Sequence, residues 1–309
     1  MMKSERSLII GGFILISIIW GSTWFAIKIG LASISPFYGI LFRFMIAAAI
    51  LAVLMKLRGE KLSFDKKSIV QYLNLAVLSF SFPFALVYWG EQYIASGLAS
   101  VLFGAYPFVV AFGSHLYLPA ERLNIFKSIG IVIGFFGIII IFWSDLHLGS
   151  ANVLGMSAIL VSTLMQGSSL VILKKINHPM SPTALSLGGM LFGLLIMIPL
   201  AIIFEDISYL KFDASGVGSI LYLSTFGTVV TFVTYYWLMK RVEVVYLSLV
   251  SFVTPILAVA LGSILLNEIL SAQMFLGAGL VLLGILTANG GDLKEQVKKM
   301  LDRKRNNGK

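Results

Sequence analysis

Apolar residues follow one another along this chain in ten blocks of about twenty, separated by short segments that carry charges, glycines and prolines. A helix rises about 1.5 Å per residue, so about twenty residues cross the hydrocarbon of a bilayer. The pattern therefore predicts an all-α integral membrane protein with ten transmembrane helices. The predicted spans are Leu8–Gly30, Pro36–Met55, Ile69–Gly90, Gly97–Leu118, Lys127–Trp143, Val153–Leu173, Pro182–Phe204, Gly216–Leu238, Val245–Leu266 and Gln273–Asn289.

Composition agrees with a membrane protein. Apolar residues make up 58% of the 309 positions and charged residues 12%, whereas soluble domains average about half apolar and about a quarter charged. The apolar blocks leave no room for a soluble domain. The chain has no cysteine, which excludes disulfides and thiolate metal sites. We expect neither a metal nor another cofactor.

The N-terminus has the basic-then-apolar order of a signal peptide, with Lys3 and Arg6 ahead of the first block. That block continues to about Gly30, and no small-residue cleavage site follows promptly. We therefore expect an uncleaved first span.

Basic residues fix the expected orientation. With the N-terminus in the cytoplasm, 20 of the 23 Lys and Arg fall on the inner side, all except Lys28, Arg43 and Lys211. This bias favours two cytoplasmic termini in a multi-pass protein of a bacterial or archaeal cytoplasmic (inner) membrane. The net charge of +9 raises the possibility of nucleic-acid binding, but no basic groove interleaved with aromatics is present. The expected surroundings are the lipid bilayer, with no nucleic acid.

The two halves of the chain repeat each other at a shift of about 147 residues. The matching positions are Gly21-Ser22-Thr23 with Gly167-Ser168-Ser169, Lys28 with Lys174, Pro36 with Pro182, Tyr88-Trp89 with Tyr236-Trp237, Ser100 with Ser248, Pro107 with Pro255, Gly130 with Gly277 and Gly137 with Gly284. Each half has five spans, an odd number, so the second half enters the membrane from the opposite face. We assign residues 1–149 and 150–291 to two inverted five-helix repeats and 292–309 to a basic cytoplasmic tail.

Loop charges support the inversion. The segment 56–67 carries five basic residues, whereas its counterpart 205–213 carries one lysine and three acids. Equivalent loops therefore lie on opposite faces of the membrane.

The chain resembles the drug/metabolite transporter superfamily, in its ten-span family with two EamA domains. The residues that carry the resemblance are Trp20-Gly21-Ser22-Thr23-Trp24, Arg43-Phe44, Pro107, Glu121, Tyr236-Trp237, Pro255 and Asn267-Glu268. The resemblance covers nearly all of Leu8 to Asn289 and implies this fold and a transport function. It specifies the substrate poorly, because the family handles amino acids, nucleosides, sugar derivatives and other metabolites.

An aromatic and neutral-polar cavity is the expected substrate site. Small residues and hydroxyls between two mid-span indoles favour either close helix packing or contact with a solute. The expected lining residues are Trp20, Ser22, Thr23, Trp24, Tyr106, Gln166, Ser168 and Ser169. Such a cavity suits a neutral or zwitterionic solute with an apolar portion.

Two prolines and two aromatic pairs occupy symmetric positions. Pro107 and Pro255 each remove a backbone hydrogen bond inside a span, which predicts either a packing kink or a helix break beside a midplane site. Tyr88-Trp89 and Tyr236-Trp237 lie near opposite ends of their spans. They are interpreted as an interfacial aromatic belt or as a pair of gates.

Few charged residues lie in or near the spans. Arg43 lies within the second span and needs a partner, for which Glu91 is the expected residue; binding of a substrate carboxylate is the alternative. Lys28 is expected to snorkel to the outer surface. Glu121 and Glu268 are interpreted as caps of the helices that follow them, with proton coupling as the alternative.

The leading hypothesis is an inner-membrane transporter that exports amino acids or similar small metabolites by alternating access. A multidrug exporter of amphipathic compounds is the alternative transporter. A membrane-embedded lipid-modifying enzyme is less well supported, because the three histidines fall on separate segments. We expect a monomer or homodimer that is not an enzyme. Because no acid lies mid-span, transport is expected to be uncoupled or weakly coupled to protons.

The inverted repeat predicts opposite locations for two loops. Because the chain has no native cysteine, single cysteines replacing Ser63 and Ser208 should react with an impermeant maleimide from opposite sides of the membrane. Labelling of both from one side would contradict the inverted repeat.

Overall fold

The computed structural model describes residues 3–118, 123–145, 149–239, 241 and 250–306, and every regular element within these ranges is a helix. The first half contains α1 (Lys3–Gly30), α2 (Pro36–Leu57), α3 (Lys66–Leu75), η1 (Ala76–Ser81), α4 (Phe82–Gly90), α5 (Ser96–Phe103), α6 (Tyr106–Tyr117) and α7 (Ile125–Asp145). The second half contains α8 (Ser150–Ile176), α9 (Pro182–Phe204), η2 (Ile207–Tyr209), α10 (Ala214–Ser224), η3 (Thr225–Val230), α11 (Thr231–Met239), α13 (Val250–Leu265) and α14 (Ala272–Asn306).

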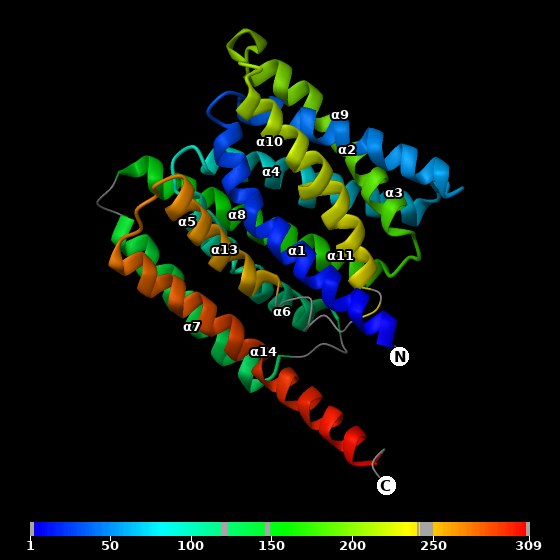
Figure 1. The fold of residues 1–309 in the computed structure, drawn as a ribbon, viewed down its shortest axis with the longest axis vertical. Helices are drawn as coiled ribbons and strands as arrows, with labels where there is room; N and C mark the ends of the chain where they lie inside the picture. Colours follow the sequence, from blue (N-terminus) through cyan, green and yellow to red (C-terminus); the bar gives the residue numbers. More distant parts are fainter. Residues whose placement is uncertain (1–2, 119–122, 146–148, 240, 242–249, 307–309) are drawn as a thin grey trace.

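Among the described residues, eight helical segments are long and apolar enough to cross a membrane, and two shorter apolar helices lie within α13 and α14. These ten segments coincide with the ten predicted spans. The third span is continuous through α3, η1 and α4, and the eighth through α10, η3 and α11. The tail is not a separate element, because α14 continues without a break from the tenth span to Asn306 (Figure 1).

The helices of the two halves pack in a two-fold pattern. Helix α1 packs against α13 and α10, and its counterpart α8 packs against α6 and α4. The pairs α2–α9 and α7–α14 each join equivalent helices of the two halves. In Figure 1 α1 crosses the middle of the molecule, and α7 with α14 forms a separate pair along one side. The sequence repeat is therefore also a repeat of helix neighbours.

Hydrogen bonds at both ends of α2 and α9 show that these equivalent helices run in opposite directions. At the start of α2, the Ser35 hydroxyl donates to Glu205, which follows the end of α9. At the start of α9, the Ser181 hydroxyl donates to Glu60, which follows the end of α2. A pair of equivalent helices that cap each other head to tail requires an inverted arrangement of the halves.

Glycines allow α7 and α14 to pack backbone to backbone, also antiparallel. A Cβ atom at Gly130 would lie 2.5 Å from the Gly284 carbonyl oxygen, and one at Gly137 would lie 2.6 Å from that of Gly277. In the sequence repeat the same four glycines are matched the other way, Gly130 with Gly277 and Gly137 with Gly284, as expected where two equivalent helices cross antiparallel. Small residues at a helix crossing give the close contact on which helix association in a membrane depends.

Replacing Gly137 with alanine should lower thermal stability in detergent, by about 1–3 kcal/mol, because the methyl group meets backbone atoms that cannot move aside. Gly279, on α14, is the matched control, since a Cβ there meets nothing within 4 Å. Gly279→Ala should be neutral or stabilising through helix propensity. Equal unfolding temperatures for the two variants would contradict the close α7–α14 contact.

Candidate functional site

Aromatic side chains from three spans meet around α1 and form a connected group, the α1 aromatic cluster. Its members are Trp20 and Trp24 of α1, Phe103 of α5, Tyr106 of α6 and Tyr235 of α11. Trp20 contacts Tyr235 with ring centroids 5.2 Å apart, and Trp24 contacts Phe103 at 5.4 Å. The Phe103 and Tyr106 rings stack at 5.7 Å, and the Tyr106 hydroxyl interacts with that of Tyr235.

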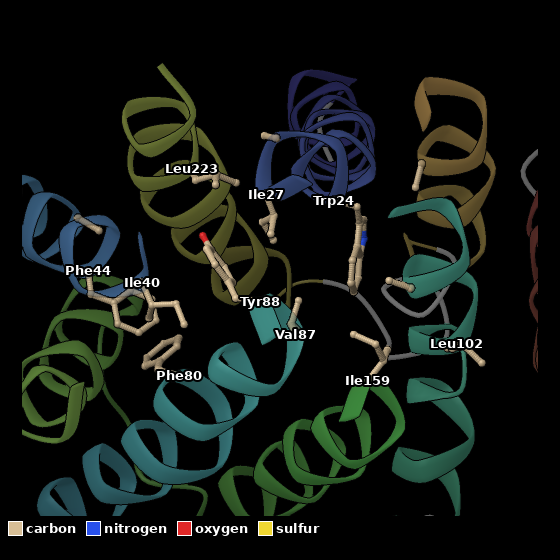
Figure 2. Packing of buried hydrophobic residues seen from close by; sticks show 14 of the residues in the cluster. Trp24, Ile27, Ile40, Phe44, Phe80, Val87, Tyr88, Leu102, Ile159 and Leu223 are labelled. Carbon is tan, nitrogen blue, oxygen red and sulfur yellow. The ribbon is translucent and has the colours of Figure 1, made fainter. Parts of the chain in front are cut away.

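The contacts form a closed ring, because the run of neighbours begins at Trp20 and ends at Trp24, which lie one helical turn apart on α1. Trp24 is 8% exposed, and the other members are partly buried. Figure 2 shows Trp24 pointing from α1 toward α8, where Ile159 lies. The structure thus brings together three predicted site residues, Trp20, Trp24 and Tyr106, and adds Phe103 and Tyr235.

Other predicted lining residues are used in helix packing. Ser22 is bonded to the Tyr222 hydroxyl at 2.6 Å, and Thr23 donates to the Trp20 carbonyl. The Gln166 amide donates to Ser162 within the same helix, and Ser168 is exposed. The predicted set is therefore not one cavity lining.

Two π-helices mark where the Gly-Ser-Thr and Gly-Ser-Ser motifs pack. Thr23 lies against Gly227 in η3, and its repeat partner Ser169 accepts a hydrogen bond from Ser79 in η1. Ser169 also accepts from the Asn74 amide. π-Helices concentrate at functional sites, because the extra residue displaces backbone bonds. The sequence repeat contained these motifs but gave no sign of the π-helices.

Arg43 is 2% exposed and is held by neutral groups. Its Nε donates to the Thr228 hydroxyl at 2.8 Å, and its Nη2 donates to the Gly227 carbonyl at 3.1 Å, both in η3. Its Nη1 donates to the Tyr88 hydroxyl at 3.3 Å, and the guanidinium lies 4.6 Å above the Phe84 ring. The guanidinium thus supplies hydrogen-bond donors to a backbone carbonyl and a hydroxyl group of the π-helix.

The predicted direct pair between Arg43 and Glu91 is wrong. Both carboxylate oxygens of Glu91 are buried and have no hydrogen-bond partner among the described residues. The guanidinium is taken up by η3, whose displaced backbone needs donors, so it does not reach the carboxylate. Lys28 extends to the turn after α4, where its ammonium donates to the carbonyls of Glu91 and Ile94.

Acidic residues cap helices of the opposite half. Glu205 accepts from the backbone nitrogens of Phe37 and Tyr38 at 2.9 and 3.0 Å. Glu268 accepts from the backbone and hydroxyl of Ser96 at 2.8 and 2.9 Å, at the start of α5. The expectation that Glu268 caps the helix after it is therefore corrected, because its side chain reaches back to the other repeat.

Glu121, for which a cap was also predicted, lies outside the described residues, as does His147. His178 lies 3.3 Å from Asp65 in the predicted inner loops. His115 accepts a hydrogen bond from the Leu123 backbone nitrogen. The described histidines thus lie apart on separate segments. Within the described residues, no group of three or more His, Asp or Glu could hold a metal ion.

One of the two predicted helix breaks is present. Pro107 is in the first turn of α6, directly after the Gly104–Ala105 turn that separates α6 from α5. Pro255 breaks nothing, because α13 continues through it from Val250 to Leu265. The two prolines match in the sequence repeat, but only one of them ends a helix. Proline leaves the carbonyl four residues earlier without its N–H partner, and the helix ends only where that carbonyl finds another partner.

The predicted gate residues fall into different environments. Tyr88 is buried and faces Arg43 and α2, and Figure 2 shows it rising from α4 toward the helix of Leu223. Trp89 contacts Tyr93 in the next turn at 4.9 Å. Tyr236 is buried beside Tyr235, whereas the Trp237 ring lies 4.3 Å from the Arg241 guanidinium. Only Tyr236 adjoins the α1 aromatic cluster.

The EamA-like transporter family profile matches residues 7–143 and 153–290, almost the whole chain in two copies. The chain belongs to the EamA-like transporter family. This membership agrees with the resemblance found in the sequence and with the all-helical membrane fold. It makes the chain a multi-pass membrane transporter, for which the substrate is a small molecule.

Curated relatives carry transporter names. A Bacillus subtilis transporter, YoaV, is 28% identical over 275 residues, which cover 89% of this chain and 94% of the relative. A transporter of Archaeoglobus fulgidus is 30% identical over 266 residues, 86% of this chain and 93% of its own. The Escherichia coli K12 inner membrane transporter YedA is 28% identical over 286 residues, 91% and 90% of the two chains.

A solved crystal structure matches with a TM-score of 0.68 and covers 91% of this chain and 97% of its own. Its sequence identity of 18% makes this a likeness of fold.

The contacts of Arg43 predict which residues it is coupled to. In a double-mutant cycle, Arg43→Met and Thr228→Val should couple by about 2 kcal/mol in unfolding free energy, because the charged bond is buried. The same cycle with Glu91→Gln should give a smaller coupling, since no direct bond joins that pair. A larger coupling to Glu91 than to Thr228 would restore the clamp predicted from the sequence.

Proposed function

We propose that the protein moves small neutral or zwitterionic metabolites with an apolar portion, such as hydrophobic amino acids, and that the α1 aromatic cluster contacts the solute. The observation that carries the proposal is the makeup of this cluster. Its five rings come from the first, fourth and eighth spans and include two tyrosine hydroxyls and two indole N–H groups. Rings offer apolar area and a few hydrogen bonds, and no member carries a full charge.

The two-fold helix packing supports alternating access as the mechanism. Inverted repeats give two packings of similar energy, one open to each side, and place the solute at the interface of the halves. Helix α1 lies at that interface, because it packs against α10, α11 and α13 of the other half. The Gly104–Ala105 turn and the two π-helices lie in the spans that surround the cluster, where a helix can bend without losing its remaining bonds.

We further propose net outward movement without an obligatory coupling ion. No Asp or Glu of the described residues lies in the core of a span, and none belongs to the α1 aromatic cluster. A solute made in the cytoplasm would then leave along its own gradient. Tyr236, buried beside Tyr235, is the proposed gate on the inner side of the cluster, and Tyr88-Trp89 is the proposed gate on the outer side.

The proposal is tested with proteoliposomes preloaded with unlabelled solute. Exchange of a labelled hydrophobic amino acid should occur without an imposed pH difference. Trp24→Ala should raise the half-saturation concentration about tenfold, which corresponds to the loss of one aromatic contact and its buried area.

Trp143→Ala is the matched control, because Trp143 is 71% exposed on α7 and lies outside the cluster. This variant should leave exchange unchanged. Exchange of amphipathic cations but of no amino acid would instead favour a multidrug exporter. Equal effects of the two tryptophan variants would contradict a role for the cluster.

A further inference from the structure

Glu91 is the one acidic residue in the described part of the chain that is fully buried without a hydrogen-bond partner. It lies in the turn after α4, just beyond the third span (Lys66–Gly90). Its exposure is 0%, and neither carboxylate oxygen is bonded within the described residues. Two other acids near this end, Glu205 and Glu268, each accept three hydrogen bonds. A buried carboxyl group with no donor is stable only in its neutral form.

Charged groups surround Glu91 at a distance. Lys28 approaches from α1 but bonds to the backbone carbonyls of Glu91 and Ile94. Arg43 of α2 is bonded to η3, Tyr88 lies one turn earlier on α4, and Glu268 lies in the turn after α13. Helix α8 packs against the turn that contains Glu91 through Gly155 and Ile159, neither of which has a titratable side chain.

These surroundings favour the protonated carboxyl. Burial raises the pKa of Glu91 well above its usual range. The Lys28 charge opposes this increase and the Glu268 charge adds to it. The Arg43 charge also opposes it, with the smallest effect of the four. In open contact with water, the same carboxyl would have its ordinary pKa, which lies well below neutral pH. The buried arrangement therefore binds a proton that the open one releases at neutral pH.

Glu91 lies where the two halves are tied together at the predicted outer end. Glu268 bonds to the start of α5 only five residues after Glu91. Asp213 accepts a hydrogen bond from Ser33 at 2.6 Å, and this bond, with those from Gly216 and Ser215, lowers the pKa of Asp213. These ties close the outer end around Glu91, and separating the halves there would admit water to its carboxyl.

We propose that Glu91 is a proton-binding site through which the external pH controls opening of the outer end. In the closed arrangement the site holds a carboxylic acid. On opening, the O–H bond breaks and the proton passes to water on the outer side, which leaves a carboxylate and a hydronium ion. Closing reverses the step with a proton from the same side, so no proton crosses the membrane. The control rests on the alternating-access function proposed above.

The sign of the pH effect follows from these two states. The closed state has the higher proton affinity, so it is favoured at low external pH and loses stability as the pH rises toward the raised pKa. Outward release of solute should therefore be slow in acid and faster in a neutral or alkaline medium. The binding step at the aromatic cluster carries no such dependence.

Cysteine accessibility tests the proposal without any solute. Ser100, in α5, is 2% exposed and its hydroxyl has no partner in the described structure, so Ser100→Cys is a conservative reporter. Its labelling by an external impermeant maleimide is divided by that of Ser208→Cys, an exposed outer position, to remove the intrinsic pH dependence of the thiol. The ratio should rise several-fold with external pH.

Two further variants separate Glu91 from other acids. Glu91→Gln, which mimics the neutral acid, should hold the ratio low at every pH. Asp206→Asn removes an exposed acid of the same face and should keep the full response. A pH-independent ratio in the otherwise unchanged reporter, or an unchanged response in Glu91→Gln, overturns the proposal.

Infrared spectroscopy gives a second readout in case Glu91→Gln folds poorly. The unsubstituted protein at neutral pH should show the carbonyl band of one buried protonated carboxyl group, which disappears at alkaline pH. Absence of that band would overturn the proposal. Neither measurement involves a solute, so a failure of amino-acid exchange would contradict the proposed function alone.

Discussion

Within a bilayer, water cannot satisfy the backbone groups that are left free where a helix begins, ends or changes its winding. In this protein, side chains of one repeat satisfy such groups in the other. Glu205 caps α2, Glu268 caps α5 and Arg43 donates to the carbonyl of Gly227 in η3. The two halves are thus joined by obligatory polar bonds as well as by apolar packing, and neither half satisfies its own backbone alone.

The two-fold arrangement is carried by backbone contacts, whereas the chemistry on each side differs. Arg43 of α2 serves the π-helix η3, but its repeat counterpart on α9, in the register that matches Pro36 with Pro182, is Gly189. There the glycines Gly189 and Gly193 let α9 approach η1 closely, and the Ser81 hydroxyl donates to the Gly193 carbonyl. The contact between α2 and η3 therefore depends on a charged side chain, whereas the equivalent contact between α9 and η1 depends on close packing at glycines.

The proposed roles divide between two depths of the molecule. The α1 aromatic cluster is uncharged and connects the first, fourth and eighth spans, which suits contact with an amphipathic solute. Glu91 lies at the end of the third span among Lys28, Arg43 and Glu268, where a proton changes the charge balance. Lys28 links the two, because it extends from α1, four residues after Trp24, to the turn that contains Glu91. A change at the turn can thus reach the helix that carries both indoles.

The sequence by itself determined the ten spans, the inverted repeat and the family, because hydrophobic block length and the parity of five spans depend only on the order of residues. It also predicted Trp20, Trp24 and Tyr106 as residues of one site, and the structure brings these three rings into one cluster. Only the tertiary structure decided the partners of the charged residues. In the sequence, Arg43 lies in the second span and Glu91 directly follows the third, which suggested that they meet. In the structure the guanidinium is bonded to η3, and the carboxyl is bonded to none of the described groups. The π-helices, the unbroken α13 at Pro255 and the role of Tyr235 were likewise outside the reach of the pattern. Each of these depends on which displaced backbone group or ring lies within about 3 to 6 Å in space, and a helical repeat does not encode that distance.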